Sequence, residues 1–251
     1  MGEAIKGLLV PFIGTSLGAA AVLFWKNGAG KRVAGFLSDA AAGIMAAAAV
    51  FSLLLPAMEQ TEAAGGMPWL SACAGFALGV SFLALWDRFS QRSARRGAVA
   101  HSTRMLVLSV CLHNIPEGMA VGAAYAALLS GPGTVTAMSA FALSLGIALQ
   151  NLPEGAIISL PLHAAGVGRG KAFLYGVLSG ASEPVAGALT ILLARFAVPA
   201  LPWLLCFVAG AMAYVTGFEL LPDTLRERPL SGTLLVLFGF ALMTGMDVLL
   251  G

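Results

Sequence analysis

Apolar residues follow one another in long stretches along this chain, and short polar segments separate the stretches. A helix needs about 20 mainly apolar residues to cross the hydrocarbon core of a bilayer. Eight stretches are long enough, and they lack the alternation of apolar and polar positions that is typical of membrane barrels. The pattern predicts an all-α integral membrane protein with one polytopic domain over residues 1–251. The predicted spans are 7–25, 33–58, 68–86, 105–129, 134–162, 172–194, 200–222 and 231–250.

The sixth predicted span carries small residues at helical spacing. Gly176 and Gly180 stand four residues apart, and Gly187 follows about two turns later. Small residues on one face of a membrane helix let the backbone of a second helix come close. We therefore expect close helix packing along this span.

Composition agrees with a membrane protein and excludes other classes. Apolar residues make up 59% of the chain and charged residues 10%, and the mean hydropathy is +0.89. Soluble domains carry about 25% charged residues, and a chain of about 300 residues buries only about 75% of its surface on folding. A soluble enzyme, a nucleic-acid-binding protein and a secreted disulfide scaffold are all excluded. The net charge of +2 is too small to indicate a polyanionic partner.

The distribution of lysine and arginine predicts the orientation. Loops on the cytoplasmic side of a membrane protein carry the excess of these residues. Of the 14 in this chain, only Lys6 and Arg195 lie outside the loops that follow the first, third, fifth and seventh spans. We expect both termini outside and a multi-pass protein in the cell inner (plasma) membrane. Glu59 and Asp247 would then lie at the external mouth, either attracting cations or forming solvated helix ends.

Three glutamates, Glu117, Glu154 and Glu183, lie in the middle of predicted spans, each beside a proline. Acidic residues at membrane depth are costly and usually functional. A single buried glutamate or proline kink is more often structural, but here two of the glutamates lie in matched hexapeptides. The three local sequences are His113-Asn114-Ile115-Pro116-Glu117-Gly118, Gln150-Asn151-Leu152-Pro153-Glu154-Gly155 and Ser182-Glu183-Pro184.

Helical spacing gives the hexapeptides a chemical meaning. Residues four apart share a helix face, which puts His113 beside Glu117 and Gln150 beside Glu154. Asn114 and Asn151 lie about 100° to the side. Each proline leaves a backbone carbonyl unpaired, and such carbonyls persist at membrane depth only where they line a cavity or bind something. Imidazole, carboxylate and amide groups together suit a divalent metal of borderline softness.

With these motifs the chain resembles the ZIP family of divalent metal transporters, and among them the bacterial members. The resemblance covers nearly the whole chain and implies a ZIP-type bundle of eight transmembrane helices, a homodimer and an elevator-like or rocking alternation. It implies a mid-membrane site for two metal ions. One ion would be held by His113, Glu117, Gln150, Glu154 and Glu183, and its neighbour by Asn114, Asn151 and the same three glutamates.

Three further positions either match the family pattern or depart from it. Met45 matches a thioether ligand position of bacterial relatives. Asn151 stands where some relatives have aspartate, and Phe218 precedes Glu219 where relatives often have histidine, which argues against a second exit site.

These features predict a carrier that imports Zn²⁺ into the cytoplasm, with Fe²⁺, Mn²⁺, Co²⁺ and Cd²⁺ as further candidate cargo. The metal is the transported substrate, and we expect no catalytic activity, no organic cofactor and no nucleic-acid partner. Two alternatives stay open: a metal-selective channel, and an intramembrane metalloprotease that uses the metal catalytically. The protease would need a His-Glu-x-x-His helix, which the sequence lacks. The sequence leaves metal selectivity and driving force undetermined.

Overall fold

The structure is a computed structural model. It describes residues 2–24, 30–94, 99–131, 135–164, 166–193, 196 and 198–250, and their side chains except at 30–32, 34, 90–94, 99–113, 219 and 250. All regular structure within these ranges is helical, as predicted.

The helices are connected by short segments. Two helical elements, η1 and η2, are single stretches of π-helix that join α-helices end to end. In chain order the elements are α1 (Gly2–Phe24), α2 (Gly30–Ala48), η1 (Ala49–Leu54), α3 (Leu55–Ala63), α4 (Pro68–Ala94), α5 (Val99–Leu129), α6 (Ala137–Ala164), α7 (Arg169–Gly180), α8 (Ser182–Leu192), α10 (Leu201–Tyr214), η2 (Val215–Leu220), α11 (Leu221–Glu227) and α12 (Ser231–Leu250).

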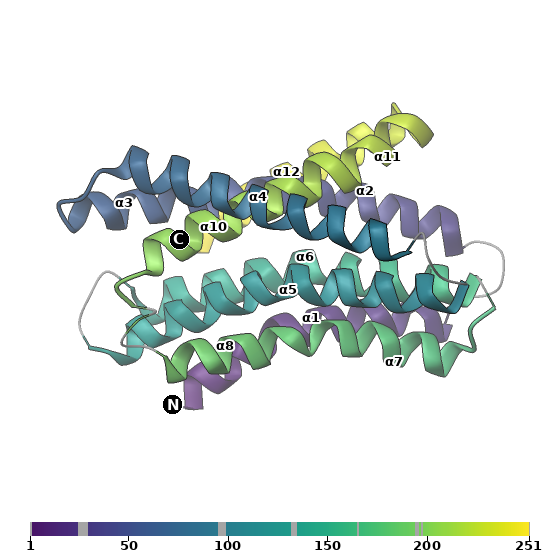
Figure 1. Ribbon diagram of the computed structural model, residues 1–251, viewed down its shortest axis with the longest axis horizontal. Helices are drawn as coiled ribbons and strands as arrows, with labels where there is room; N and C mark the ends of the chain where they lie inside the picture. Colours follow the sequence, from purple (N-terminus) through teal and green to yellow (C-terminus); the bar gives the residue numbers. More distant parts are fainter. Residues whose placement is uncertain are drawn as a thin grey trace.

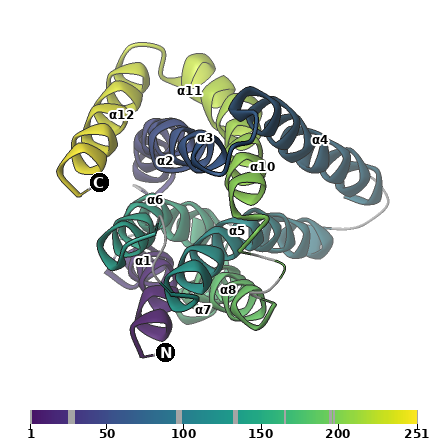
Figure 2. The same ribbon diagram turned by 90° about the vertical axis from the view of Figure 1, so that its left-hand side faces the viewer.

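The helices form two groups (Figures 1 and 2). In the first group α6 packs on α1, and the α7–α8 pair packs on α1 and α5. In the second group α12 packs on α2, and α10 packs on α4. The two groups meet mainly where α2 lies on α6 and where α10 lies on α5.

Six helices within the described ranges are long and apolar enough to cross a membrane. Two run through a π-helical stretch without a break, over Gly35–Ala63 and Leu201–Glu227. The other two predicted spans, 105–129 and 172–194, correspond to α5 and to the α7–α8 pair. The integral membrane character is confirmed, whereas the number of eight spans stays a prediction.

The sixth predicted span is not one continuous helix. It breaks at Ala181, between α7 and α8. Pro184 has no N–H to donate to the carbonyl of Gly180, so the helical hydrogen-bond ladder is interrupted there. The carbonyl of Ser179 instead accepts hydrogen bonds from Ser182 Oγ (3.0 Å) and from Asn114 Nδ2 of α5 (3.3 Å). At the break, the backbone oxygen of Ser179 therefore faces α5 and accepts a hydrogen bond from it.

Small residues along α7 and α8 allow the close packing predicted from the sequence. A Cβ atom added to Gly176 would lie 2.6 Å from Cβ of Ala19, and one added to Gly180 would lie 2.8 Å from Cβ of Thr15. A Cβ atom on Gly187 would overlap the side chain of Leu8. The helix that approaches this face is α1.

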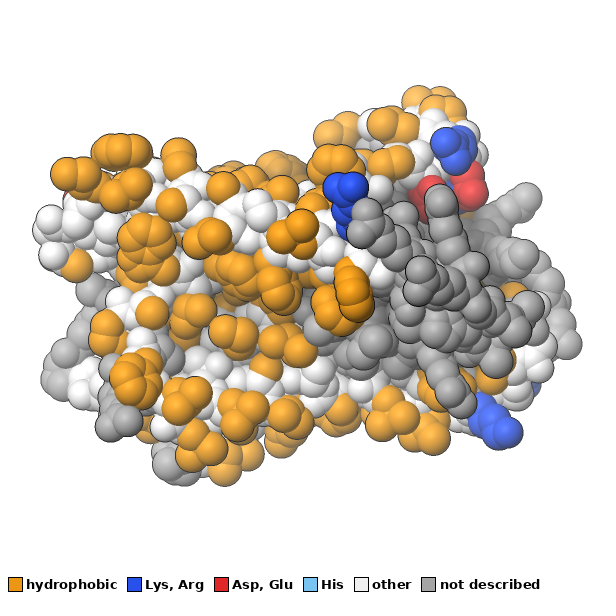
Figure 3. All heavy atoms as spheres, viewed as in Figure 1, with side chains coloured by type: hydrophobic (Ala, Val, Ile, Leu, Met, Phe, Trp, Pro, Cys, Tyr) orange, Lys and Arg blue, Asp and Glu red, His pale blue; other side chains and the backbone are white. Residues whose placement is uncertain are grey.

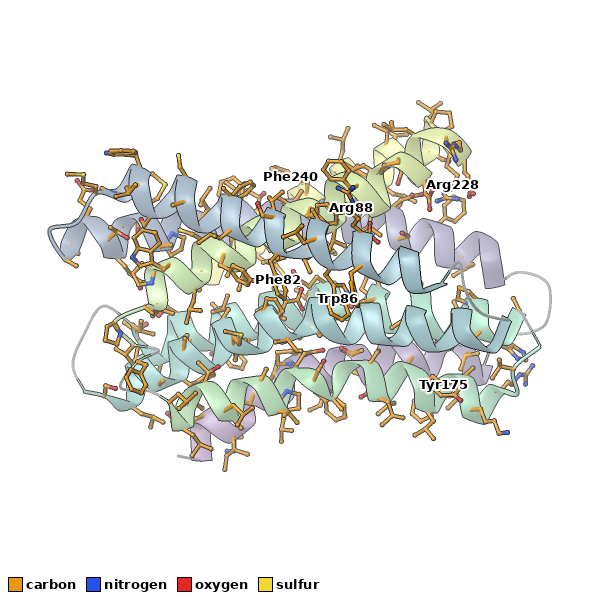
Figure 4. The ribbon with its side chains drawn as sticks, viewed as in Figure 1. Phe82, Trp86, Arg88, Tyr175, Arg228 and Phe240 are labelled. Atoms are coloured by element: carbon orange, nitrogen blue, oxygen red, sulfur yellow. The ribbon has the colours of Figure 1, made fainter. Side chains whose placement is uncertain are left out.

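Both chain ends lie at one end of the bundle, and the last turns of α4 and α6 and the first turns of α5 and α7 lie at the other (Figures 1 and 2). Hydrophobic side chains cover much of the described surface in Figure 3, and the lysines and arginines that it colours blue lie toward the end with these turns. Arg88 of α4 and Arg228, which follows α11, lie in this half (Figure 4). The arrangement agrees with an apolar belt and a charged end.

Aromatic side chains join helices within the second group. The ring centroids of Phe51 in η1 and Phe240 in α12 are 6.0 Å apart, and those of Phe82 in α4 and Phe207 in α10 are 5.6 Å apart. Figure 4 places Phe82 and Phe240 within this group. Such pairs stabilise packing by about 0.5–1.5 kcal/mol beyond their burial.

Candidate metal centre

Glu183 begins α8 inside the first helix group, with 1% of its surface exposed. Its Oε1 atom accepts two hydrogen bonds, one from Asn114 Nδ2 of α5 (3.0 Å) and one from Thr15 Oγ1 of α1 (3.0 Å). The second oxygen, Oε2, is buried and has no hydrogen-bond partner. Three helices therefore fix one carboxylate and leave one of its oxygen atoms unused.

Glu117 in α5 follows the same scheme. Gln150 Nε2 of α6 donates a hydrogen bond to Glu117 Oε1 (2.6 Å), and Glu117 Oε2 is buried without a partner. The two hexapeptides thus meet, since the amide of the second bonds the carboxylate of the first. The geometry confirms that α5 and α6 bring Glu117 and Gln150 together.

The amide side chains of this region also keep oxygen atoms without hydrogen-bond partners among the described residues. Asn114 and Gln150 donate through nitrogen to a glutamate, which leaves each amide oxygen buried and unpartnered. Asn151 approaches Glu183, but neither its amide nitrogen nor its oxygen makes a hydrogen bond of normal geometry. Among the described side chains of the predicted site, five buried oxygens thus lack a partner: Asn114 Oδ1, Glu117 Oε2, Gln150 Oε1, Asn151 Oδ1 and Glu183 Oε2.

Unsatisfied buried polar groups cost about 1–3 kcal/mol each. Five unpartnered oxygens in one region of the helix bundle are therefore expensive unless a ligand supplies what they lack. Carboxylate and amide oxygens are ligands for divalent cations, and carboxylate oxygens bind Zn²⁺ as well. The arrangement can surround a cation with oxygen atoms at membrane depth.

Glu154 of α6 completes a group of three acidic residues. It lies within electrostatic reach of both Glu117 and Glu183, and Glu117 and Glu183 also repel each other. Like charges in a low-dielectric interior repel strongly, and a divalent cation relieves that repulsion. In the described part of the chain, no three His, Cys, Asp or Glu side chains lie close enough together to hold a metal ion by themselves. Much of this donor set consists of amides instead.

The glycine that ends each hexapeptide lies at a helix contact. A Cβ atom on Gly118 would lie 2.8 Å from Cα of Glu183, so the backbone of α8 lies close against α5 where Glu183 enters the site. A Cβ atom on Gly155 would overlap the backbone oxygen of Thr15 in α1. Both glycines admit the backbone of a helix that carries a polar side chain of the site.

Two further predicted ligands, His113 and Met45, are not tested by these hydrogen bonds. The backbone of His113 is part of α5, but its side chain lies outside the described residues. Met45 is buried in α2, within the apolar core and on the helix that packs against α6. Their roles as ligands stay predictions.

At the secondary position of the family pattern, Phe218 is 70% exposed and its ring stacks on Tyr214. The side chain of its neighbour Glu219 lies outside the part of the chain that the structure describes. The prediction that no second exit site forms here is not tested.

Sequence reasoning missed Thr15 and the carbonyl of Ser179. Thr15 is fully buried and lies in an apolar stretch that contains no acidic residue between Glu3 and Asp39. The one available signal was its position between Gly14 and Gly18, since glycines four residues apart indicate a close helix contact.

A cavity of about 560 Å³ lies at the end of the bundle that carries both termini. Glu59 of α3, Asp247 of α12 and Ser52 of η1 line it, together with residues of α6 and α10. Ser52 Oγ donates a 2.7 Å hydrogen bond to Asp247 Oδ1. The acidic residues predicted at the external mouth therefore line one shared cavity.

Comparisons with known proteins agree with this chemistry. Residues 91–247 match the family model described as ZIP Zinc transporter. The zinc transporter GufA of Myxococcus xanthus is 34% identical over the full length of both chains. The zinc transporter ZIPB of Bordetella bronchiseptica is 33% identical over all of this chain and 82% of its own. The zinc transporter ZIP11 of Xenopus tropicalis is 31% identical over 99% of this chain and 97% of its own.

Proposed function

This chain belongs to the ZIP family of zinc transporters, and on that premise we propose that it imports Zn²⁺ across the plasma membrane through a mid-membrane site for two metal ions. As a member of this family it is a multi-pass membrane transporter of divalent metal ions and not an enzyme. The metalloprotease alternative is therefore set aside.

One observation carries the proposal: among the described residues, five side chains of α5, α6 and α8 that the motifs single out each keep a buried, unpartnered oxygen, and two of these oxygens belong to Glu117 and Glu183. His113, Glu117, Gln150, Glu154 and Glu183 would hold one ion, and Asn114, Asn151 and the glutamates its neighbour. Met45 would add a thioether from α2. Such ligands replace the hydration shell of the ion, yet they must release it again.

We infer the route to the site from the placement of charged residues. The cavity lined by Glu59 and Asp247 offers negative charge to cations outside. Twelve of the 14 lysines and arginines fall in the segments that the sequence assigns to the loops after the first, third, fifth and seventh spans, which supports import toward that side as the cytoplasmic side. Impermeant thiol reagents test this orientation. Cysteines introduced beside Glu62 should react from outside, and cysteines beside Arg226 should not; inverted labelling would reject the import direction.

Uptake of radioactive Zn²⁺ into proteoliposomes tests the transport itself. We expect saturable uptake, inhibition by competing divalent ions and counter-transport of preloaded metal. Flux that does not saturate and shows no counter-transport would identify a channel instead of a carrier. An imposed pH gradient in the same vesicles reveals the driving force. Cross-linking in the membrane tests the homodimer and the alternating motion of the two helix groups that the family implies.

A further inference from the structure

We propose that Thr15 is a specificity-determining positioning residue, which makes Glu183 bind its metal ion through a single oxygen and thereby favours small divalent cations. The proposal rests on the function proposed above, since it requires Glu183 to be a ligand. It assigns a role to α1, a helix that contributes none of the ligands predicted from the sequence.

The hydroxyl of Thr15 has one proton and two acceptors within reach. Glu183 Oε1 lies at 3.0 Å, and the carbonyl of Pro11, one turn back in α1, lies at 3.4 Å. A carboxylate accepts a stronger hydrogen bond than a neutral carbonyl, and 3.4 Å is long for a hydroxyl donor. The proton therefore goes to Glu183.

Asn114 Nδ2 donates to the same carboxylate oxygen. Each carboxylate oxygen has about two lone-pair sites, so these two donors occupy both sites of Oε1. Only Oε2 stays available, and it is the oxygen that is buried without a partner. With both donors in place, Glu183 can offer a metal one oxygen but not two.

Packing prevents Thr15 from turning away. Its side chain is completely buried, and the position of a Cβ atom on Gly180 lies 2.8–3.0 Å from Thr15 Cβ, Cγ2 and Oγ1. Its backbone oxygen lies against Gly155. The hydroxyl is thus held between α6 and α7 and aimed at α8. A branched side chain in a helix also has few rotamers, which makes the position more rigid.

The number of oxygens that Glu183 offers to a metal links this hydrogen bond to the choice of ion. Zn²⁺ usually takes four ligands, whereas larger cations such as Ca²⁺ take six to eight and readily accept both oxygens of one carboxylate. Occupying Oε1 withholds the second oxygen that a larger ion would use. Removing the hydroxyl leaves Oε1 with one donor and frees a lone pair for the metal. The ions that gain should be larger than Zn²⁺, and Cd²⁺ is the test ion.

The experiment compares Thr15→Val, Thr15→Ala and Thr15→Ser in the full-length protein in proteoliposomes. Valine preserves the branched shape without the hydroxyl, alanine removes both hydroxyl and branch, and serine keeps the hydroxyl alone. Uptake of Zn²⁺ and Cd²⁺ is measured for each variant as KM and maximal rate. Thr190→Val is the matched control, since this buried hydroxyl of α8 donates to the carbonyl of Ala186 in its own helix (2.8 Å).

We expect Thr15→Val to raise the KM for Zn²⁺ by about tenfold, the lower end of the effect of a group that orients a metal ligand. The preference for Cd²⁺ over Zn²⁺ should rise in both hydroxyl-free variants. Thr15→Ser and Thr190→Val should keep the parental KM and preference. If Thr15→Val does not fold, Thr15→Ala supplies the same comparison without added bulk.

Two results would overturn the proposal. In one, the hydroxyl-free variants keep the parental preference between Cd²⁺ and Zn²⁺. In the other, Thr15→Ser changes as much as Thr15→Val, which would make the methyl group responsible. Glu183→Gln separates the two levels of the argument. If Glu183→Gln transports like the parent, the proposed site itself is wrong; if it loses uptake while Thr15 variants behave as parental, only the role of Thr15 fails.

Discussion

Two buried carboxylates in this protein have opposite surroundings. Asp39 of α2 is fully buried, and both of its oxygens are paired. Arg228 Nε donates to Oδ2 (2.7 Å), while Arg228 Nη2 (3.1 Å) and Thr224 Oγ1 (2.6 Å) donate to Oδ1. Glu183 is equally buried, but its hydrogen-bond donors are uncharged and Oε2 has none.

The difference separates a structural carboxylate from one that can bind a cation. Arg228 balances the charge of Asp39, and each oxygen of Asp39 accepts at least one hydrogen bond, so neither oxygen is left unpartnered for a metal. Hydrogen bonding to Asp39 raises the pKa of the Arg228 guanidinium above its ordinary value, so the arginine stays charged at every pH of interest. At Glu183 and Glu117 the protein supplies orientation without the compensating charge. Burial alone therefore does not mark a binding site; unused lone pairs do.

The strongest effect on transport should come from the glutamates of the proposed site. Glu117→Ala or Glu154→Ala removes a negative charge that can face both ions. Loss of a residue that only hydrogen-bonds a metal ligand already lowers metal affinity about 10–100-fold, so loss of a ligand should have a larger effect. We expect uptake to fall by more than about 100-fold while folded protein stays in the membrane. Radiometal uptake and size-exclusion profiles check this. Parental uptake by either variant would remove that glutamate from the site.

Asp39→Ala should have the largest effect on stability. It leaves the partly buried Arg228 with only the exposed Glu227 as its acidic partner, so the free energy of unfolding should fall by about 3 kcal/mol, the lower end of the cost of breaking a buried pair. Thermal unfolding in detergent should show the loss, while the preference among metals stays parental. Replacing both partners with apolar residues, Asp39→Leu with Arg228→Met, should recover most of the stability. A changed metal preference in Asp39→Ala would contradict a purely structural role.

Asn151→Asp tests whether an added negative charge strengthens metal binding at the weaker site. Two divalent ions carry four positive charges, and three glutamates supply three negative ones, so the parent should hold one ion firmly and one weakly. An added carboxylate should strengthen the weaker site by about tenfold, because the number of ligand charges tunes cation affinity over decades. Metal titration and anomalous scattering measure the occupancy. Two equal ions in the parent, unchanged by Asn151→Asp, would refute the charge argument.

Thr224→Val should have the smallest effect. It removes one hydrogen bond to Asp39 Oδ1, which Arg228 Nη2 still partners, so we expect a loss of about 1 kcal/mol in unfolding free energy. Uptake should keep its parental KM. The matching change at the other carboxylate, Thr15→Val, is expected to alter KM and metal preference instead. Equal behaviour of the two threonine variants would show that the contrast between the carboxylates is not functional.

Much of this could be predicted from sequence because the information is local. Apolar stretches of sufficient length indicated membrane helices. The matched hexapeptides placed His113 beside Glu117 on one helix and Gln150 beside Glu154 on the next, and in the structure Gln150 donates a hydrogen bond to Glu117. Membership of the ZIP family, inferred from these motifs, is confirmed by the comparisons.

Tertiary structure alone decided which distant residues share a site. Asp39 and Arg228 are 189 residues apart, and Thr15 and Glu183 are 168 apart, and neither pairing has a local pattern. A threonine in an apolar helix looks the same whether its hydroxyl bonds its own backbone, as Thr190 does, or a carboxylate on another helix. Sequence fixes the faces of single helices because helical geometry repeats along the chain. The partner of each face depends on how all the helices pack together, which no single segment encodes.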